Sequence, residues 1–428
     1  MNRYKFKDGR RLRCGYTTGT CAAAAAAAAV RLLLKGESVR QVFVELPEGG
    51  EAEIAVEFVR MEENVKYAEA GRESGGISAA SRGLSECRDG DVAGMPPVSV
   101  SAGVRKDAGD DADVTDGMLI CVTVRPEGAG KDFGERVVIS AGRGVGRVTK
   151  PGLDQPVGEA AVNTVPRRMI CREVEKVCRE AGYDGRISAE ISVPGGEEAA
   201  AKTFNPLLGV EGGISILGTS GIVEPMSDRA VVETIRTEVR SKAALCRQRG
   251  QSVCLAAVPG NYGMRFLREK LGLRDDRVVK CSNFIGETLD ACWEYGADGI
   301  LLAGNAGKLI KLAAGVMNTH SSEADARMET IVSCSLEAGA SLELLRRTAE
   351  CVTTEAAFSL LGGEGLAQRV LDIAAERAAA HMARRVRNQT AVGIVIFSSE
   401  SDLSARGGDA EAILEKMKIH ETILERNE

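Results

Sequence analysis

The most constraining feature of this sequence is one pattern that residues 213–308 repeat four times. Each time, a short apolar run is followed by a loop rich in glycine and small polar residues, and then by a helical pattern. Strands that alternate with helices predict a parallel sheet with helices packed on its faces. The runs and their loops are 213–217 with 218–221, 253–258 with 259–263, 278–281 with 282–286, and 300–303 with 304–308.

The loops of this pattern predict a binding site. All strands of a parallel sheet end at one edge, where open α/β sheets bind their ligands. Glycine lets the main chain approach a ligand closely, and N–H groups at helix starts favour its anionic or polar parts. The second half of the chain is therefore predicted to hold a small molecule. The candidate binding residues are Thr219, Ser220, Gly221, Gly260, Asn261, Gly263, Asn283, Gly286, Gly304, Asn305, Gly307 and Lys308.

Composition limits the class of protein. The chain has 428 residues, of which 44% are hydrophobic and 27% charged, so we expect two or three domains with ample cores. The net charge of −6 argues against a nucleic-acid-binding protein, and an anionic ligand would need a local basic patch. The longest run of small apolar residues, 22–30, is far shorter than the ~20 residues of a membrane span. We therefore expect a cytoplasmic protein that does not bind membranes.

The cysteines and histidines do not predict a metal site. Twelve cysteines occur without a C-x-x-C pair, and His320, His381 and His420 are the only histidines. A structural zinc site would need a denser cluster of these ligands. Cys171 and Cys178 are seven residues apart in a helical pattern, so both are expected to face a core as free thiols.

The first half of the chain has a different pattern. An alanine run follows Thr17 and Thr18, and it predicts a helix with a threonine cap at its start. The alanines favour a tightly packed buried helix, whereas the threonines can also face a ligand. Alternating apolar residues predict strands within 38–46, 51–60, 119–125 and 136–140. Residues 1–205 are therefore expected to form an α+β domain, with a surface insertion at 69–97, and residues 206–428 a parallel α/β domain.

A cluster of aspartates follows the insertion. Five of the ten residues 107–116 are aspartate, and their spacing does not match a calcium-binding loop. An acidic, solvated turn and a functional cluster of carboxylates explain this composition equally well. Clustered carboxylates repel one another, so the pKa of some should be raised unless cations or N–H donors compensate.

Six segments resemble the CbiD family of cobalt-precorrin-5B C(1)-methyltransferases, in the same order along most of the chain. They are GYTTG at 15–19, KDAGDD at 106–111, GVGRVTKPGL at 144–153, PGGEE at 194–198, GTSGIVEPMS at 218–227 and KLIKLAAG at 308–315. The resemblance implies that S-adenosylmethionine methylates carbon 1 of a cobalt-bearing tetrapyrrole on the anaerobic route to cobalamin. It also implies an N-terminal domain similar to the second domain of ribosomal protein S5, and a C-terminal domain with Rossmann-like layers.

The same resemblance assigns expected roles to the candidate residues. The glycine loops would hold S-adenosylmethionine, and cobalt would arrive as part of the substrate. The hydroxyls of Thr17 and Thr18 would contact the substrate at the helix start. The substrate's acetate and propionate groups would bind cations, namely Arg143, Arg147 and Lys150. A solvated basic face remains an equal explanation for any one of these cations. For the aspartates the resemblance favours function, with Asp110 and Asp111 as candidates to accept a proton.

Two other classes of protein remain open, and so does a homo-oligomer. A nicotinamide-dependent reductase would need an acidic residue that holds the ribose after a glycine-rich turn, and no convincing pair is present. A non-catalytic tetrapyrrole-binding protein would need the basic residues but not the glycine loops. Asn305 stands where the family usually has histidine, so this position can form hydrogen bonds but cannot transfer a proton as histidine would.

Overall fold

The protein folds as two compact units, Met1–Ser227 and Asp228–Glu428. The computed structural model describes residues 3–7, 9–62, 99–127 and 135–425, so the predicted insertion at 69–97 lies outside the described residues. The boundary between the units lies after residue 227 and not after 205. The reason is that short strands within 210–223 pair with strands of the first unit, as set out below.

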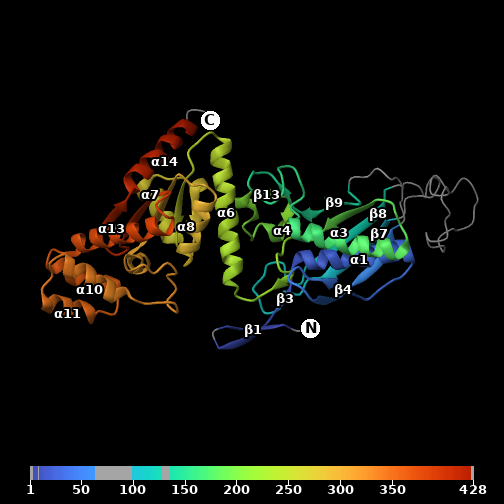
Figure 1. Ribbon diagram of the computed structural model, residues 1–428, viewed down its shortest axis with the longest axis horizontal. Coiled ribbons are helices and arrows are strands. Elements are labelled where there is room, and N and C mark those ends of the chain that lie inside the picture. Colours follow the sequence, from blue (N-terminus) through green and yellow to red (C-terminus); the bar gives the residue numbers. More distant parts are fainter. Residues whose placement is uncertain (1–2, 8, 63–98, 128–134, 426–428) are drawn as a thin grey trace, which may run out of the picture. The chain divides into compact units, whose positions relative to one another are not determined.

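The first unit contains a five-stranded sheet of order β6-β7-β8-β12-β9 (Figure 1). Neighbours are antiparallel except β12 and β9, which are parallel and are linked through helix α3. The strands are β6 (Phe58–Glu62), β7 (Ser99–Arg105), β8 (Leu119–Pro126), β9 (Val137–Ala141) and β12 (Ile187–Ser192). Sequence patterns predicted β8 and β9 but neither β7 nor β12, and the single strand predicted over 51–60 is divided into one that ends at Ala55 and β6.

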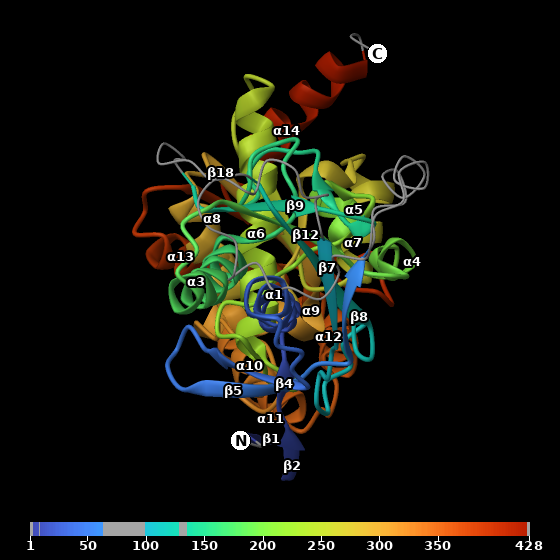
Figure 2. The same cartoon turned by 90° about the vertical axis from the view of Figure 1, so that its right-hand side faces the viewer.

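Helix α1 (Thr18–Lys35) is the central helix of the first unit's core, and Figure 2 shows it nearly end-on. Ala22 to Ala29 are at most 2% exposed, and the helix packs against α3 (Thr164–Ala181), β7 and β8. Small side chains allow this close approach, so the predicted tightly packed helix is confirmed. The helix is also long and apolar enough to span a membrane, but 83% of it is buried inside the protein, which is typical of a core helix.

Short strands complete the first unit. The hairpins are β1 (Tyr4–Lys7) with β2 (Arg10–Arg13), and β4 (Gln41–Glu45) with β5 (Glu51–Ala55). The other pairs are β3 (Gly15–Tyr16) with β15 (Ile222–Val223), β10 (Gly144–Val145) with β14 (Gly213–Ile214), and β11 (Arg147–Val148) with β13 (Val210–Glu211). Two short helices, α4 (Gly196–Ala200) and α5 (Asn205–Leu208), lie between β12 and β13. The apolar run 213–217 was therefore wrongly assigned to the parallel sheet, because its strand pairs within the first unit.

The second unit is built on a sheet of order β17-β16-β18-β19-β20. Its strands are β16 (Cys254–Val258), β17 (Val278–Lys280), β18 (Gly299–Asn305), β19 (Ala391–Phe397) and β20 (Ser404–Gly408). All neighbours are parallel except β19 and β20, so the predicted parallel sheet is confirmed apart from its last strand. The mixed α/β class is thus established for the whole chain, and the finer names, S5-like and Rossmann-like, stay predictions.

Helices cover both faces of the second sheet. One core joins a face of the sheet to α6 (Asp228–Gln248), α8 (Ile285–Glu294) and α13 (Ala367–Arg385). A second core joins the other face to α7 (Asn261–Leu271) and α14 (Ala410–Glu425). Between β18 and β19 the chain forms α9 (Ala306–Leu309), the 3-10 helix η5 (Ile310–Ala314), α10 (Arg327–Glu337), α11 (Leu342–Ala349) and α12 (Thr354–Gly363), and η4 (Asp275–Arg277) precedes β17.

The strand order places a topological switch point between β16 and β18. After β16 the chain forms β17 on one side, and then β18 on the other side of β16. The connections after β16 and β18 therefore run in opposite directions from neighbouring strands. Open α/β sheets bind ligands at such a point, outside the carboxyl ends of the strands.

Candidate functional site

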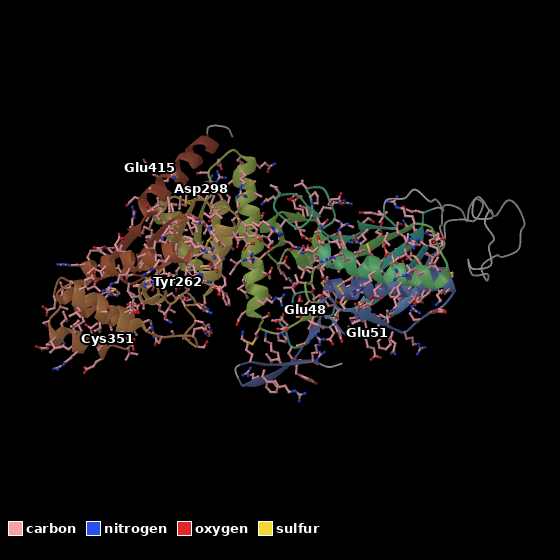
Figure 3. All side chains as sticks on the ribbon, in the orientation of Figure 1. Glu48, Glu51, Tyr262, Asp298, Cys351 and Glu415 are labelled. Carbon is pink, nitrogen blue, oxygen red and sulfur yellow. The ribbon has the colours of Figure 1, made fainter. Side chains whose placement is uncertain are left out.

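The loop after β16 begins the carboxyl edge of the second sheet. Gly260 has extended backbone, and a Cβ placed on it would meet nothing within 4 Å. Asn261 and Tyr262 follow at the exposed start of α7 (Figure 3), and the Asn261 Oδ1 atom accepts a hydrogen bond from Lys280 Nζ at 3.2 Å. Gly263 has a structural role, because its Cβ would lie 2.9 Å from the Ala303 carbonyl oxygen and push α7 away from the sheet.

The loops after β17 and β18 contact each other through side chains. Lys308 Nζ donates to Asn283 Oδ1 at 2.8 Å, and Thr319 Oγ1 donates to the same oxygen at 3.4 Å. The structure thus brings together two residues that the sequence predicted from separate loops. Gly286 lies in the first turn of α8, where its N–H donates to the Met317 carbonyl. A Cβ on Gly286 would lie only 3.0 Å from the Met317 Cβ, so this glycine serves packing.

Asn305 connects the loops after β18 and β19. Its Oδ1 atom accepts from the Gly307 N–H at 2.7 Å, and its Nδ2 atom donates to Ser399 Oγ at 2.9 Å. Gly304 leaves just enough room for Leu309, which would lie 3.1 Å from a Cβ at that position. Ser399 was not predicted, although 391–397 is an apolar run followed by small polar residues, like the earlier loops of the same sheet.

A buried lysine holds the segment that follows η5. Lys311 is 4% exposed, and its Nζ atom donates to the carbonyls of Thr319 at 3.3 Å and Ala324 at 2.8 Å. Burial lowers the pKa of Lys311. Because the Thr319 N–H donates to the Asn283 carbonyl at 3.0 Å, Lys311 also stabilises the loop after β17.

Thr219, Ser220 and Gly221 belong to the first unit, so grouping them with the loops of the second sheet was wrong. Ser220 Oγ accepts from the Ile222 N–H at 3.2 Å and forms a local turn. Gly221 has a φ of 81°, and a Cβ there would lie 2.8 Å from Leu46. Its glycine is therefore required by the fold, whereas a contact of these three residues with a cofactor stays a prediction.

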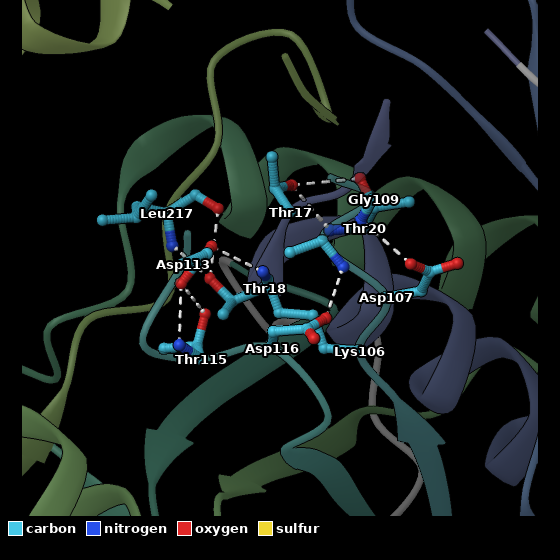
Figure 4. Close-up of polar contacts among 11 residues, drawn as sticks. Thr17, Thr18, Thr20, Lys106, Asp107, Gly109, Asp113, Thr115, Asp116 and Leu217 are labelled. Atoms are coloured by element: carbon cyan, nitrogen blue, oxygen red, sulfur yellow. Dashed lines mark hydrogen bonds and ion pairs between the residues drawn. The ribbon is translucent and has the colours of Figure 1, made fainter. Parts of the chain in front are cut away.

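A buried ion pair organises the aspartate cluster (Figure 4). The Lys106 side chain is 1% exposed, and its Nζ atom lies 2.6 Å from Asp113 Oδ2. Asp113 Oδ1 accepts from the N–H of Thr115 at 2.7 Å and from its hydroxyl at 2.6 Å. Burial raises the pKa of Asp113, but the hydrogen bonds from Lys106 and Thr115 outweigh it, so the pKa is lowered. Asp116 accepts from the Ala108 N–H at 2.8 Å.

The other three aspartates bind the N-terminal hairpin and the end of the first unit. Arg13 donates to both oxygens of Asp107, at 2.5 and 2.7 Å, and this pair lowers the pKa of Asp107. Asp110 Oδ2 accepts from the Arg13 N–H at 2.6 Å, and Asp111 Oδ1 accepts from the Met226 N–H at 3.1 Å. Cations and N–H groups thus compensate the clustered charges, and Asp110 and Asp111 each use one oxygen to hold the fold.

The two threonines at the start of α1 are also used by the fold. Thr17 Oγ1 caps the helix by accepting from the Thr20 N–H at 3.2 Å, which confirms the predicted threonine cap. Thr18 Oγ1 accepts from the Leu217 N–H at 2.9 Å and donates to its carbonyl at 3.2 Å. Both threonines are buried, and their contact with a substrate stays a prediction.

The predicted substrate cations lie before, on and after the short strands β10 and β11 of the first unit. Arg143 is exposed, with its Nε atom 3.8 Å from Glu197 Oε1. Arg147 is exposed in β11 and donates to the Gly158 carbonyl at 3.2 Å. Lys150 is half-buried, and its side chain fills the space beside Gly209. Arg143 and Arg147 therefore present charge to solvent, as a site for carboxylates would require.

The first unit also contains a cleft of about 400 Å³ that the sequence did not predict. Its lining combines both charges, and Lys5 Nζ lies 2.7 Å from Glu224 Oε2 across it. Cys14 is half-buried there, and burial raises the pKa of its thiol. The lining residues are Arg3, Tyr4, Lys5, Cys14, Glu48, Ser220, Ile222 and Glu224. The basic character of residues 3–13 is visible in the sequence. The other lining residues, at 48 and 220–224, are distant in sequence, so the cleft could not be predicted.

Metal and thiol chemistry receive no support from the described residues. Within them no group of three His, Cys, Asp or Glu side chains could hold a metal ion. The cysteines in the described ranges are free, and most are buried, Cys178 among them, while Cys171 is half-buried. Burial raises the pKa of Cys21, Cys281 and Cys292 to about 12, so these thiols stay protonated and pack as apolar side chains.

The second unit is thus an α/β domain in which glycine loops and amide side chains lie along the carboxyl edge of the sheet. Comparison with known proteins gives the family. Residues 5–84 and 91–225 match the CbiD family, and residues 318–408 match the CbiD C-terminal domain. The chain belongs to the CbiD family.

Close relatives have one name in common. The chain is 39% identical to a cobalt-precorrin-5B C(1)-methyltransferase of Ruminiclostridium cellulolyticum, over 93% of this chain and 92% of that protein. It is 37% identical to a protein of the same name from Alkaliphilus metalliredigens, over 98% of each chain. A crystal structure of the cobalamin biosynthesis protein cbiD from Archaeoglobus fulgidus is 28% identical, covering 76% of this chain and 87% of that chain, with a TM-score of 0.36.

Proposed function

We propose that this protein is a cobalt-precorrin-5B C(1)-methyltransferase, which transfers a methyl group from S-adenosylmethionine to ring carbon 1 and forms cobalt-precorrin-6A in anaerobic cobalamin biosynthesis. The observation that carries this proposal is the 39% identity, over nearly the whole length of both chains, to a protein with that name. The substrate is a tetrapyrrole, and cobalt enters as part of this substrate and not as a cofactor of the protein.

The switch point of the second unit is the best-supported site for the methyl donor. Gly260 leaves space beside its Cα, and Asn261, Asn283 and Asn305 offer amide groups along the same edge of the sheet. Gly307 adds main chain without a side chain next to the Asn305 amide, and a Cβ there would lie 3.2 Å from Asn305 Oδ1. Polar groups beside bare glycine backbone suit the adenosine and methionine parts of the donor. The residues present therefore fit S-adenosylmethionine.

The chemistry needs positioning more than side-chain catalysis. The donor supplies an electrophilic methyl group, and the electron pair of the broken C–S bond stays on sulfur in S-adenosylhomocysteine. The nucleophile is a carbon of the conjugated macrocycle. The protein has to hold the two reactants in line at short distance, which can contribute ~7 to 11 kcal/mol to catalysis. Amides and glycine loops of the second unit orient the donor for this step.

The first unit carries the groups proposed to hold the substrate. Exposed Arg143 and Arg147, together with Lys150, match the carboxylates of a tetrapyrrole. Asp110 and Asp111 are the proposed proton acceptors, since each keeps one carboxylate oxygen that no main-chain N–H holds. The other oxygen of each carboxylate accepts a hydrogen bond from a main-chain N–H, which holds the side chain in place.

Calorimetry on the full-length protein tests the proposal against the other two classes. A methyltransferase should bind S-adenosylmethionine and S-adenosylhomocysteine, but neither NADH nor NADPH. Addition of cobalt-precorrin-5B to the S-adenosylmethionine complex should release S-adenosylhomocysteine. Binding of a nicotinamide cofactor would indicate a reductase, and binding of the tetrapyrrole without any binding of the methyl donor would indicate a carrier protein.

A further inference from the structure

A buried hydroxyl in helix α12 has no partner in the described part of the chain. Thr354 is 1% exposed, and its Oγ1 atom forms no hydrogen bond. The helix does not need this hydroxyl as a cap, because Thr353 Oγ1 already accepts from the Ala356 N–H at 3.1 Å. Burying a polar group without a partner is unfavourable, and buried hydroxyls in native proteins are nearly always paired. The hydroxyl is therefore available to a bound group.

The hydroxyl lies close to Gly307. A Cβ placed on Gly307 would lie 3.9 Å from Thr354 Oγ1 and 4.0 Å from Glu355 Oε1. Gly307 does not have a positive φ, so its backbone conformation does not demand glycine. The same Cβ would lie 3.2 Å from Asn305 Oδ1, so both oxygens are close to the amide that the proposed donor site already contains.

Glu355 is the charged group at this position. It is half-buried, and no hydrogen bond or ion pair to it occurs within the described ranges. Arg327 feels the charge of Glu355, but its pKa is raised first by its hydrogen bonds to Asp325 and only in a smaller part by Glu355. Arg327 donates to both oxygens of Asp325, at 2.5 and 3.0 Å. The guanidinium group of Arg327 is therefore engaged by Asp325, and the Glu355 carboxylate can still accept hydrogen bonds.

We propose that Thr354 and Glu355 bind the α-ammonium group of the methionine portion of S-adenosylmethionine, beside Gly307. This inference rests on the proposed function and deepens it. An ammonium group has a positive charge and three N–H donors, which match one carboxylate and one unpaired hydroxyl. A ribose diol also has donors, but a neutral group would gain less from the Glu355 charge, because charge-assisted hydrogen bonds are the stronger ones.

The test compares two ligands that differ at the amino-acid end. S-adenosylhomocysteine has the α-ammonium group, whereas 5′-methylthioadenosine retains adenine and ribose but lacks the amino acid. Calorimetry on the full-length protein should show that Glu355→Gln weakens binding of S-adenosylhomocysteine about tenfold or more, as expected for loss of a charge-assisted hydrogen bond. The affinity for 5′-methylthioadenosine should change by less than about twofold, because this ligand lacks the group that Glu355 is proposed to contact. Thr354→Val should show the same selectivity with a smaller effect.

A matched control is available on the neighbouring helix. Glu343 lies in the first turn of α11 and is exposed, so Glu343→Gln removes the same charge from the same helical position and should leave both affinities unchanged. Equal weakening of both ligands by Glu355→Gln would overturn the assignment to the ammonium group, and unchanged affinity for S-adenosylhomocysteine would exclude Glu355 from the site. If the parent protein binds neither ligand, the proposed function itself fails.

Discussion

Replacing Lys106 with methionine should destabilise the first unit strongly. Methionine retains much of the apolar length of lysine, so the change mainly removes the charge. Asp113 would then lose its ion pair while its side chain, 25% exposed, stays largely buried. Arg105→Met is the matched control, because Arg105 is the preceding residue of the chain and pairs with Glu57 on the surface at 2.5 Å.

The size of the effect follows from burial. Removing one partner of a fully buried ion pair costs about 3–5 kcal/mol. Asp113 retains two hydrogen bonds from Thr115 and some contact with water, so we expect about 2–3 kcal/mol at neutral pH. The exposed pair of Arg105 should contribute little, because surface ion pairs are screened by solvent.

The pH dependence has a definite sign. The pKa of Asp113 is lowered in the folded protein, so its stabilising contribution is complete above the unfolded value of ~3.9 and is lost as the pH falls through the folded pKa. The difference in stability between the parent protein and Lys106→Met should therefore be full at pH 7. It should narrow when the pH falls below about 4.

Hydrogen exchange of the α1 amides is a suitable assay. Trp293, the single tryptophan, lies in α8 of the second unit, so its fluorescence does not report on the first unit. A loss of about 2–3 kcal/mol should speed the slowest exchange in α1 roughly 30- to 150-fold, with α13 as a reference from the second unit. An equal effect of Arg105→Met would contradict the stabilising role of the buried Lys106–Asp113 ion pair. So would a stability difference between the parent protein and Lys106→Met that persisted unchanged at acidic pH.

Three further predictions concern the proposed donor and substrate sites. Gly260→Val should fold, because nothing lies within 4 Å of the new Cβ, yet weaken S-adenosylmethionine in calorimetry, and unchanged affinity in a folded variant would exclude that loop. Asp110→Asn and Asp111→Asn should each lower turnover about tenfold or more while both ligands still bind, and turnover at the parent rate in both would leave the cluster as a structural turn. Arg147→Gln should raise the dissociation constant of the tetrapyrrole while the donor affinity is preserved, and added salt should mimic the change. Equal weakening of both ligands would instead indicate a structural role for Arg147.

The sequence predicted β16, β17 and β18 of the second sheet but not β19 and β20, because each of the three is a continuous apolar run followed by a loop that contains glycine. It failed at 213–217, where a similar run forms only the two-residue strand β14. The local pattern gives no sign of the pairing partner, which lies near residue 144. The packing role of Gly221 was missed for the same reason, since the clash of a Cβ with Leu46 depends on a contact distant in sequence.

The polar residues of the site were predicted only in part. Asn283, Asn305 and Lys308 were predicted because they lie at or shortly after the ends of strands, and the structure brings Asn283 and Lys308 into contact. Lys311, Thr354 and Glu355 were missed, because their burial and hydrogen bonds depend on the path of the chain between β18 and β19. For the aspartates, composition left two explanations open. The structure shows how cations and N–H groups compensate the charges, which composition cannot reveal.

The position of the transferred methyl group tests the central claim most directly. The full-length protein would be incubated with cobalt-precorrin-5B and S-adenosylmethionine labelled with ¹³C in its methyl group, and the product examined by NMR. We expect one labelled methyl group, bonded to ring carbon 1, with one S-adenosylhomocysteine formed for each methyl transferred. A label at another position of the macrocycle, or no label in the tetrapyrrole while the protein binds both ligands, would contradict the proposed function.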